Sequence, residues 1–379
     1  MIARSIHLVA ETRSFERAAM TMKHLLGHEL SAKTIERLAH QVGEELAQDW
    51  TTGAGPKETV VPDVAVVSCD GGRIRTRAAN ALPGVHDPAW RETKNASFER
   101  MQSPATANTD PCPGLPDTFR QLDHVAKIAE KGAFSQVSPE EEAPRPRYQG
   151  PQRVLRTCLS SMACSRDFGH QMQQEAKRRR FNESSKKVFI GDGLAWNWSI
   201  WKEHFPDFTP VLDFIHAVQY LYAAAEALAD DGPTRWACYR RFAELVWQGR
   251  VNDVIAELET ELVARGVDKP EDLPEDHALR PLADAARYLT NNRQRMNYPA
   301  YRRAGLPLTS SPMESLIKQI NYRVKGTEMF WNNPSGAEAI LQIRAASLCE
   351  DGRLADYLAR RTGSPFVRRT TRAIMANAA

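Results

Sequence analysis

Two acidic residues in the middle of the chain lie at the ends of apolar runs, where catalytic or metal-binding residues are often found. Asp192 directly follows the apolar run Val188–Ile190, and Asp213 lies in a second apolar run that ends at His216. If the runs are parallel strands joined by a helix, both carboxylates lie at the edge where open α/β sheets bind ligands. Mg²⁺ prefers such oxygen ligands in proteins. Taken alone, Asp192 is better explained as a loop aspartate chosen for turn chemistry.

Two further acids have the same double interpretation. Asp70 ends the apolar run Val64–Cys69, as a catalytic residue at the end of a central strand would, but Asp70-Gly71 is also a strong hairpin signal. Glu314 falls in the first turn of a helix that we expect to start at Ser311. There it can complete a capping box with Ser311 or pair with Lys318 four residues later.

The composition limits the protein class. The chain has 379 residues, and 50 Lys and Arg against 47 Asp and Glu leave a net charge of +3, so any nucleic-acid surface must be local. The six cysteines form no CxxC pair, which indicates reduced thiols rather than a zinc ribbon. No segment is apolar enough to cross a membrane, and we expect a soluble cytoplasmic protein.

Helices are expected on both sides of the apolar runs. The segment 15–26 is predicted to be a helix ending at Gly27, and a second helix starts near Ser31, so the pair is either a helix-turn-helix or a plain helical hairpin. Residues 90–98 are a candidate strand in a meander with the Asp70 strand. From His216 to about Pro299 the pattern is helical throughout.

The order of several motifs along the chain adds a resemblance. From about Val64 to Asp351 the chain resembles bacterial insertion-sequence transposases of the DDE type, in the Mutator-like group and most closely the Kra family. The blocks that carry the resemblance are Cys69–Ile74, Trp90–Glu92, Gly191–Gly193, Leu212–Ala217, Gly305–Pro307 through Glu314-Ser315, Arg323–Gly326, Phe330-Trp331 and Ala337–Arg344.

The resemblance implies a fold and a catalytic triad. The implied fold class is α/β, an RNase H-like catalytic core with an all-helical insertion and a small helical N-terminal region. Asp70, Asp192 and Glu314 would be the triad and the metal ligands, holding two Mg²⁺ ions, with Mn²⁺ as a substitute. Asp213 and His216 would form a supporting D-x-x-H signature, although a histidine there is also explained as a structural residue. The ions would assist phosphoryl transfer at the element's ends and at target DNA.

Partners and boundaries follow from the resemblance together with the charge pattern, in which the basic run 177–180 is either a DNA contact or a solvated helix face. The expected partner is double-stranded DNA, bound by a homodimer or larger assembly, with no membrane and no small-molecule cofactor, in the cytoplasm and on the nucleoid when bound to DNA. The expected parts are 1–55 (helical, either a helix-turn-helix or a hairpin), 56–216 (core), 217–300 (helical insertion), 301–350 (core with the Glu314 helix) and 351–379 (basic tail). The predicted DNA-contacting residues are Lys177, Arg178, Arg179, Arg180, Arg323, Lys325 and Trp331, and the tail adds Arg360, Arg361, Arg368, Arg369 and Arg372.

Two alternatives remain open at this point. The chain could be a catalytically inactive DNA-binding relic in which the acids serve only caps and turns. It could also be a metal-dependent nuclease that cuts without joining strands.

Overall fold

The chain has an α/β fold, seen in a computed structural model that describes residues 1–53, 58–77, 89–104, 113–137, 147–326 and 330–361. Its contacts divide it into two compact units. The first unit comprises residues 1–100, 153–184 and 312–379, and the second comprises 101–152 and 185–311. The predicted fold class is confirmed at the level of α/β.

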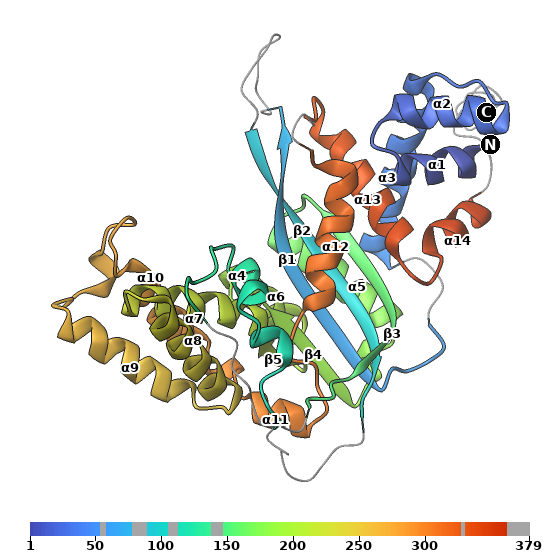
Figure 1. Cartoon of the computed structure of the whole chain (residues 1–379). Coiled ribbons are helices and arrows are strands. Elements are labelled where there is room, and N and C mark those ends of the chain that lie inside the picture. The colour runs from blue at the N-terminus through green and yellow to red at the C-terminus, as the bar shows by residue number, and fades with distance from the viewer. Residues whose placement is uncertain (54–57, 78–88, 105–112, 138–146, 327–329, 362–379) are drawn as a thin grey trace. The chain divides into compact units, whose positions relative to one another are not determined.

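Five strands form a mixed sheet in the order β3-β2-β1-β4-β5 (Figure 1). Strands β4 and β5 are parallel. Strands β1 and β2 run antiparallel, because Arg75 lies over the ring of Trp90 while the earlier residue Gly72 faces the later residue Thr93. The strands are β1 (Val64–Thr76), β2 (Ala89–Gln102), β3 (Gln152–Ser161), β4 (Lys186–Gly191) and β5 (Thr209–Leu212).

Strand β1 continues through the Asp70-Gly71 pair, so the predicted end of the strand and the alternative hairpin at this point are both wrong. Gly72 allows close strand packing instead of forming a turn. A Cβ on Gly72 would lie 2.7 Å from the hydroxyl oxygen of Thr93 on β2. Asp70 therefore lies within a long strand, with residues 64–69 buried before it.

Helices of the first unit include the predicted N-terminal pair. Helix α2 ends at Gly27, which has a φ of 65°, and α3 begins after the N-cap Ser31, whose side chain accepts the Thr34 N–H, so both predicted boundaries are confirmed. Helix α3 packs closely on α13, since a Cβ on Gly43 would lie 2.4 Å from Ala339. This contact fits a packed hairpin, and the helix-turn-helix stays a prediction. The helices are α1 (Ile2–Glu11), α2 (Phe15–Leu26), α3 (Ala32–Thr52), α5 (Ser165–Arg178), α12 (Ser311–Val324), α13 (Pro334–Leu348) and α14 (Arg353–Arg360).

Among its described residues, the secondary structure of the second unit is helical apart from β4, β5, the end of β2 and the first residue of β3. Its helical segment begins at Phe214, because β5 stops at Leu212 and Asp213 is the N-cap of α7. An aromatic cluster around Phe214 fills this unit, with ring centroids 5.0 to 5.2 Å from those of Phe119, Trp247 and Tyr298. The helices are α4 (Leu122–Ile128), α6 (Ala195–His204), α7 (Phe214–Leu228), α8 (Gly232–Trp247), α9 (Val251–Ala264), α10 (Arg280–Asn292) and α11 (Tyr298–Arg303).

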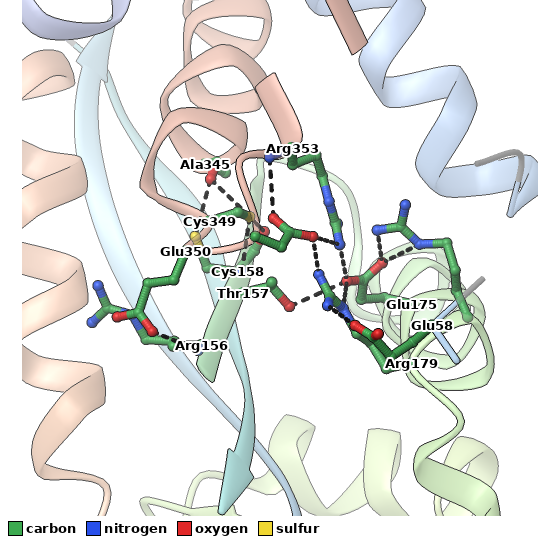
Figure 2. Close-up of polar contacts among 12 residues, drawn as sticks. Glu58, Arg156, Thr157, Cys158, Glu175, Arg179, Ala345, Cys349, Glu350 and Arg353 are labelled. Atoms are coloured by element: carbon green, nitrogen blue, oxygen red, sulfur yellow. Dashed lines mark hydrogen bonds and ion pairs between the residues drawn. The ribbon is translucent and has the colours of Figure 1, made fainter. Parts of the chain in front are cut away.

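Two buried thiols meet where β3 passes the end of α13 (Figure 2). The thiols of Cys158 and Cys349 each donate to the carbonyl of Ala345 at 3.2 Å, and the Cys158 N–H donates to the Cys349 sulfur at 3.4 Å. None of the described cysteines forms a disulfide, and Cys112 lies outside the described residues. No helix within the described ranges has both the length and the apolar character needed to cross a bilayer.

Candidate active site

The predicted strand-helix-strand unit around Asp192 is present. In the parallel pair, Val188 lies opposite Thr209 and Gly191 opposite Leu212. Asp192 and Asp213 each directly follow the last residue of their strand, and the Asp213 N–H donates to the Gly191 carbonyl at 2.9 Å. The two aspartates therefore lie together at the carboxyl edge of β4 and β5, as expected.

Glycines flank Asp192 because aromatic side chains pack directly against the loop. A Cβ on Gly191 would lie 3.0 Å from the Trp198 ring. Gly193 has a φ of 101°, and a Cβ there would lie 2.5 Å from the Tyr288 ring. The Tyr288 hydroxyl donates to the Asp192 carbonyl at 2.6 Å. The loop conformation that presents Asp192 is thus fixed by these neighbours.

The Asp192 side chain is largely buried and held through one of its oxygens. Its Oδ1 accepts the Leu194 N–H at 2.8 Å and a short hydrogen bond from the Asn197 amide. Burial raises the pKa of the Asp192 carboxyl above its ordinary value, and the charge of Asp213 adds to the rise, while the Leu194 N–H and His216 oppose it. A divalent cation would stabilise a carboxylate in such surroundings, because it supplies the missing opposite charge.

Asp213 has a clear structural role. It is 1% exposed, its Oδ1 accepts the Ile215 N–H at 2.9 Å as the α7 N-cap, and its Oδ2 accepts the Ser310 hydroxyl. His216 lies in the first turn of α7, which corrects the prediction of a strand end, and its Nε2 is 3.9 Å from Asp213 Oδ2. Its Nδ1 is 3.0 Å from the Gln219 side-chain oxygen. These two contacts of His216 fit its structural interpretation.

The other two acids of the predicted triad belong to the first unit. Asp70 is half-buried, and its Oδ1 accepts the Gly71 N–H at 2.6 Å. Glu314 is exposed on α12, and its Oε2 is 3.3 Å from the Lys318 ammonium, so the predicted i,i+4 pair is present. The Ser311 side chain of the alternative capping box lies outside the described residues. Since Asp192 belongs to the second unit, convergence of all three acids on one pair of metal ions stays a prediction.

A metal site would need more than the two aspartates at the β4 and β5 edge. No three His, Cys, Asp or Glu side chains in the described part of the chain are grouped so that they could hold a metal ion. Asp192 has the properties of a ligand, because both of its described side-chain hydrogen bonds go to Oδ1. Asp213 fits less well, since a cap and a hydroxyl already engage both of its oxygens.

The basic run at the end of α5 forms intramolecular ion pairs (Figure 2). Arg178 binds Oε2 of the buried Glu175 at 2.5 Å, while Arg179 and Arg353 bind its Oε1 at 3.1 and 2.7 Å. Arg179, whose side chain is 5% exposed, also pairs with Glu58 at 3.2 Å. Burial of Arg178 and Arg179 in this ion-pair cluster does not fit the predicted DNA contacts.

The two ends of that run differ from its middle. Arg180 binds Glu183 at 2.6 Å and donates to the Thr59 carbonyl at 2.6 Å. Lys177 is exposed and donates only to Gln173 among its described contacts, at 3.3 Å. Of the four residues, Lys177 alone therefore has the exposure that the prediction requires.

The three predicted contacts after α12 have different surroundings. Arg323 is 1% exposed and donates to the Val9 carbonyl at 2.7 Å, so it fixes α1 and is not accessible to a phosphate. Burial lowers its pKa to about 10. The Trp331 indole donates to the Val324 carbonyl at 2.9 Å, and its backbone pairs with Thr76. Lys325 is exposed and stays a candidate DNA contact.

The beginning of the basic tail is also anchored. Arg361 binds Glu45 of α3 at 2.7 Å, while Arg360 is exposed. The other predicted contacts of the tail, Arg368, Arg369 and Arg372, lie outside the described residues.

Two residues that matter to the site were not predicted from the sequence. Asn197 is fully buried in the first turn of α6 and donates to Asp192, and Tyr288 comes from α10, nearly a hundred residues later. A polar residue five positions after Asp192, in an aromatic-rich segment, could have indicated a hydrogen bond to the loop. Nothing local in the sequence could have connected Tyr288 to the loop.

Comparison with known proteins does not assign the chain to a family. No protein-family profile matches the chain, and a search of curated proteins finds no similar sequence. A functional proposal must therefore depend on the residues themselves.

Proposed function

We propose that this protein is a DNA transposase of an insertion sequence, a Mg²⁺-dependent polynucleotidyl transferase with an RNase H-like core. The observation that carries the proposal is the carboxyl edge of β4 and β5, where half-buried Asp192 lies in a loop fixed by Gly193 and Tyr288. Open α/β sheets bind ligands at this edge. The resemblance of the motif blocks to DDE transposases supplies the reaction and the other two acids.

In this proposal the chain's own groups have separate tasks. Asp192 would hold a metal ion through the oxygen that Asn197 leaves available, and Asp70 and Glu314 would complete the site. Bound Mg²⁺ would stabilise the attacking and leaving oxygens of an in-line displacement at phosphorus. Tyr288 and Asn197 would keep Asp192 in place, which avoids reorganisation during the reaction. The protein would act in the cytoplasm, on the nucleoid when bound to DNA.

The test is cleavage of labelled DNA carrying the element's ends, by the full-length protein with Mg²⁺ or Mn²⁺. We expect nicking that requires the metal and is lost in Asp70→Asn, Asp192→Asn and Glu314→Gln. Strand-joining products distinguish a transposase from a nuclease. DNA binding without nicking in the wild type would overturn the proposal and leave the inactive relic.

A further inference from the structure

One face of the β1 and β2 pair is strongly basic beyond Asp70. Side chains alternate between the two faces of a strand, and accordingly Ile74 and Thr76 are buried, while on the opposite face Arg73 is exposed and Arg75 and Arg77 are half-buried. The nearby acid Glu92 binds Lys94 at 2.8 Å and is thereby neutralised. The three arginines thus give this face a positive charge although the whole chain is nearly balanced.

An exposed tryptophan lies among these cations. Trp90 of β2 is 56% exposed, which is unusual for so large an apolar side chain. The Arg75 guanidinium lies 5.7 Å from the centroid of its ring, and the Lys325 ammonium lies 5.9 Å from it. Two cations from different elements therefore reach the same indole, and much of its surface remains accessible.

The same surface continues along α12 to Glu314. Glu314, Lys318, Asn321 and Lys325 are spaced by four, three and four residues, so they share one helix face. Lys325 extends the helical pattern, because its N–H donates to the Asn321 carbonyl at 2.7 Å. At a rise of 1.5 Å per residue, Lys325 is about 17 Å from Glu314 along the helix. All these residues belong to the first unit.

We propose that Arg73, Arg75, Arg77, Trp90 and Lys325 form a binding surface for an unpaired DNA strand, called here the arginine–tryptophan face. Trp90 stacks on a base, and the cations contact phosphates on either side of it. Single-strand sites combine a basic track with aromatic side chains in this way. An acidic protein segment would be matched by the arginines alone and would give no role to an accessible indole.

The inference rests on the proposed function and makes it more specific. A strand that leaves the arginine–tryptophan face along α12 reaches Glu314 after about 17 Å. At the stacked spacing of about 3.4 Å per nucleotide that a strand has in duplex DNA, this distance corresponds to about five nucleotides, and a more extended single strand covers it with fewer. The face would therefore hold the unpaired part of a substrate within about five nucleotides of a phosphate at Glu314.

The experiment measures binding of a labelled 20-nucleotide oligothymidine and of a blunt duplex of the same length, by fluorescence anisotropy over a range of salt. We expect Trp90→Ala to weaken single-strand binding between about 5- and 150-fold, the range measured for loss of one stacked base. The salt dependence should not change, because no charge is removed. Trp90→Phe should recover part of the affinity.

Arg73→Gln should change the salt dependence of single-strand binding. Removing one phosphate contact lowers the slope of log affinity against log salt by about 0.7 for a single strand. Arg293→Gln is the matched control, because Arg293 is also exposed but lies in the second unit, and it should bind as the wild type does. Circular dichroism and melting temperatures establish that each variant is folded.

The inference is overturned if folded Trp90→Ala and Arg73→Gln both bind the single strand as the wild type does, or if both lose no more than Arg293→Gln. Its failure differs from failure of the proposed function. Asp192→Asn should abolish nicking yet bind the single strand normally. If the wild type never nicks but the two face variants lose binding, the arginine–tryptophan face stands and the transposase proposal falls.

Discussion

Replacing Glu175 by Gln tests the buried ion-pair cluster at the end of α5. The Glu175 carboxylate is fully buried and accepts hydrogen bonds from Arg178, Arg179 and Arg353, and from the Thr157 hydroxyl at 3.2 Å. Removing one partner of a buried ion pair typically costs about 3–5 kcal/mol, because the remaining charges stay buried. Arg179 and Arg353 keep Asp351 as a partner, so we expect a loss of about 3 kcal/mol.

The predicted loss depends on pH in a defined direction. Burial alone would raise the pKa of Glu175, but the charges of Arg353, Arg178 and Arg179 hold it well below its ordinary value. A lowered pKa contributes stability that is present above the unfolded value of about 4.3 and is lost as the pH falls further. The difference between wild type and Glu175→Gln should therefore be full at pH 7 and shrink below about pH 4.

The assay is urea unfolding followed by circular dichroism at pH 7 and at pH 3.5. Glu183→Gln is the control, because Glu183 also pairs with an arginine of the basic run, but its side chain is 53% exposed. Exposed pairs contribute about 0–1 kcal/mol. A free energy of unfolding for Glu175→Gln within about 1 kcal/mol of the wild type at pH 7 would refute the role assigned to this cluster.

Two predictions concern the Asp192 loop. Asn197→Ala removes the amide that orients Asp192. Mutating the hydrogen-bond partners of metal ligands typically lowers metal affinity or activity by about 10- to 100-fold, so we expect Mg²⁺-dependent nicking to fall by that factor. A melting temperature close to that of the wild type would show that the effect is local. Gly193→Ala should lower both melting temperature and nicking, because its Cβ would lie 2.5 Å from the Tyr288 ring at a φ of 101°; unchanged values in both assays would contradict the packing described.

Local patterns were enough to predict several elements. Gly27 and Ser31 end and start helices through their own backbone and side-chain chemistry, so the boundaries of α2 and α3 could be predicted. The apolar run before Gly191, followed by a helical pattern and a second run, predicted the parallel pair β4 and β5. These features depend on residues close in sequence.

Other features depend on partners that are distant in the chain. Asp70-Gly71 has the composition of a turn, yet the strand continues because β2 packs against Gly72. Strand β3 was not predicted, since its first half is exposed and follows a Pro-rich segment. The basic run was interpreted as a DNA contact because nothing near Arg179 in sequence reveals that Asp351 would bind it 172 residues later.

Cys158 and Cys349, which both donate to the carbonyl of Ala345, can be used to detect local opening between β3 and the end of α13. Cys158 and Cys349 are 0% and 5% exposed, whereas Cys164 is exposed. An alkylating reagent should therefore modify Cys164 at once and reach the buried pair only when β3 separates from the end of α13. The time course of labelling, measured separately for each cysteine-containing peptide, would give the rate at which the contact between β3 and the end of α13 opens in the native protein.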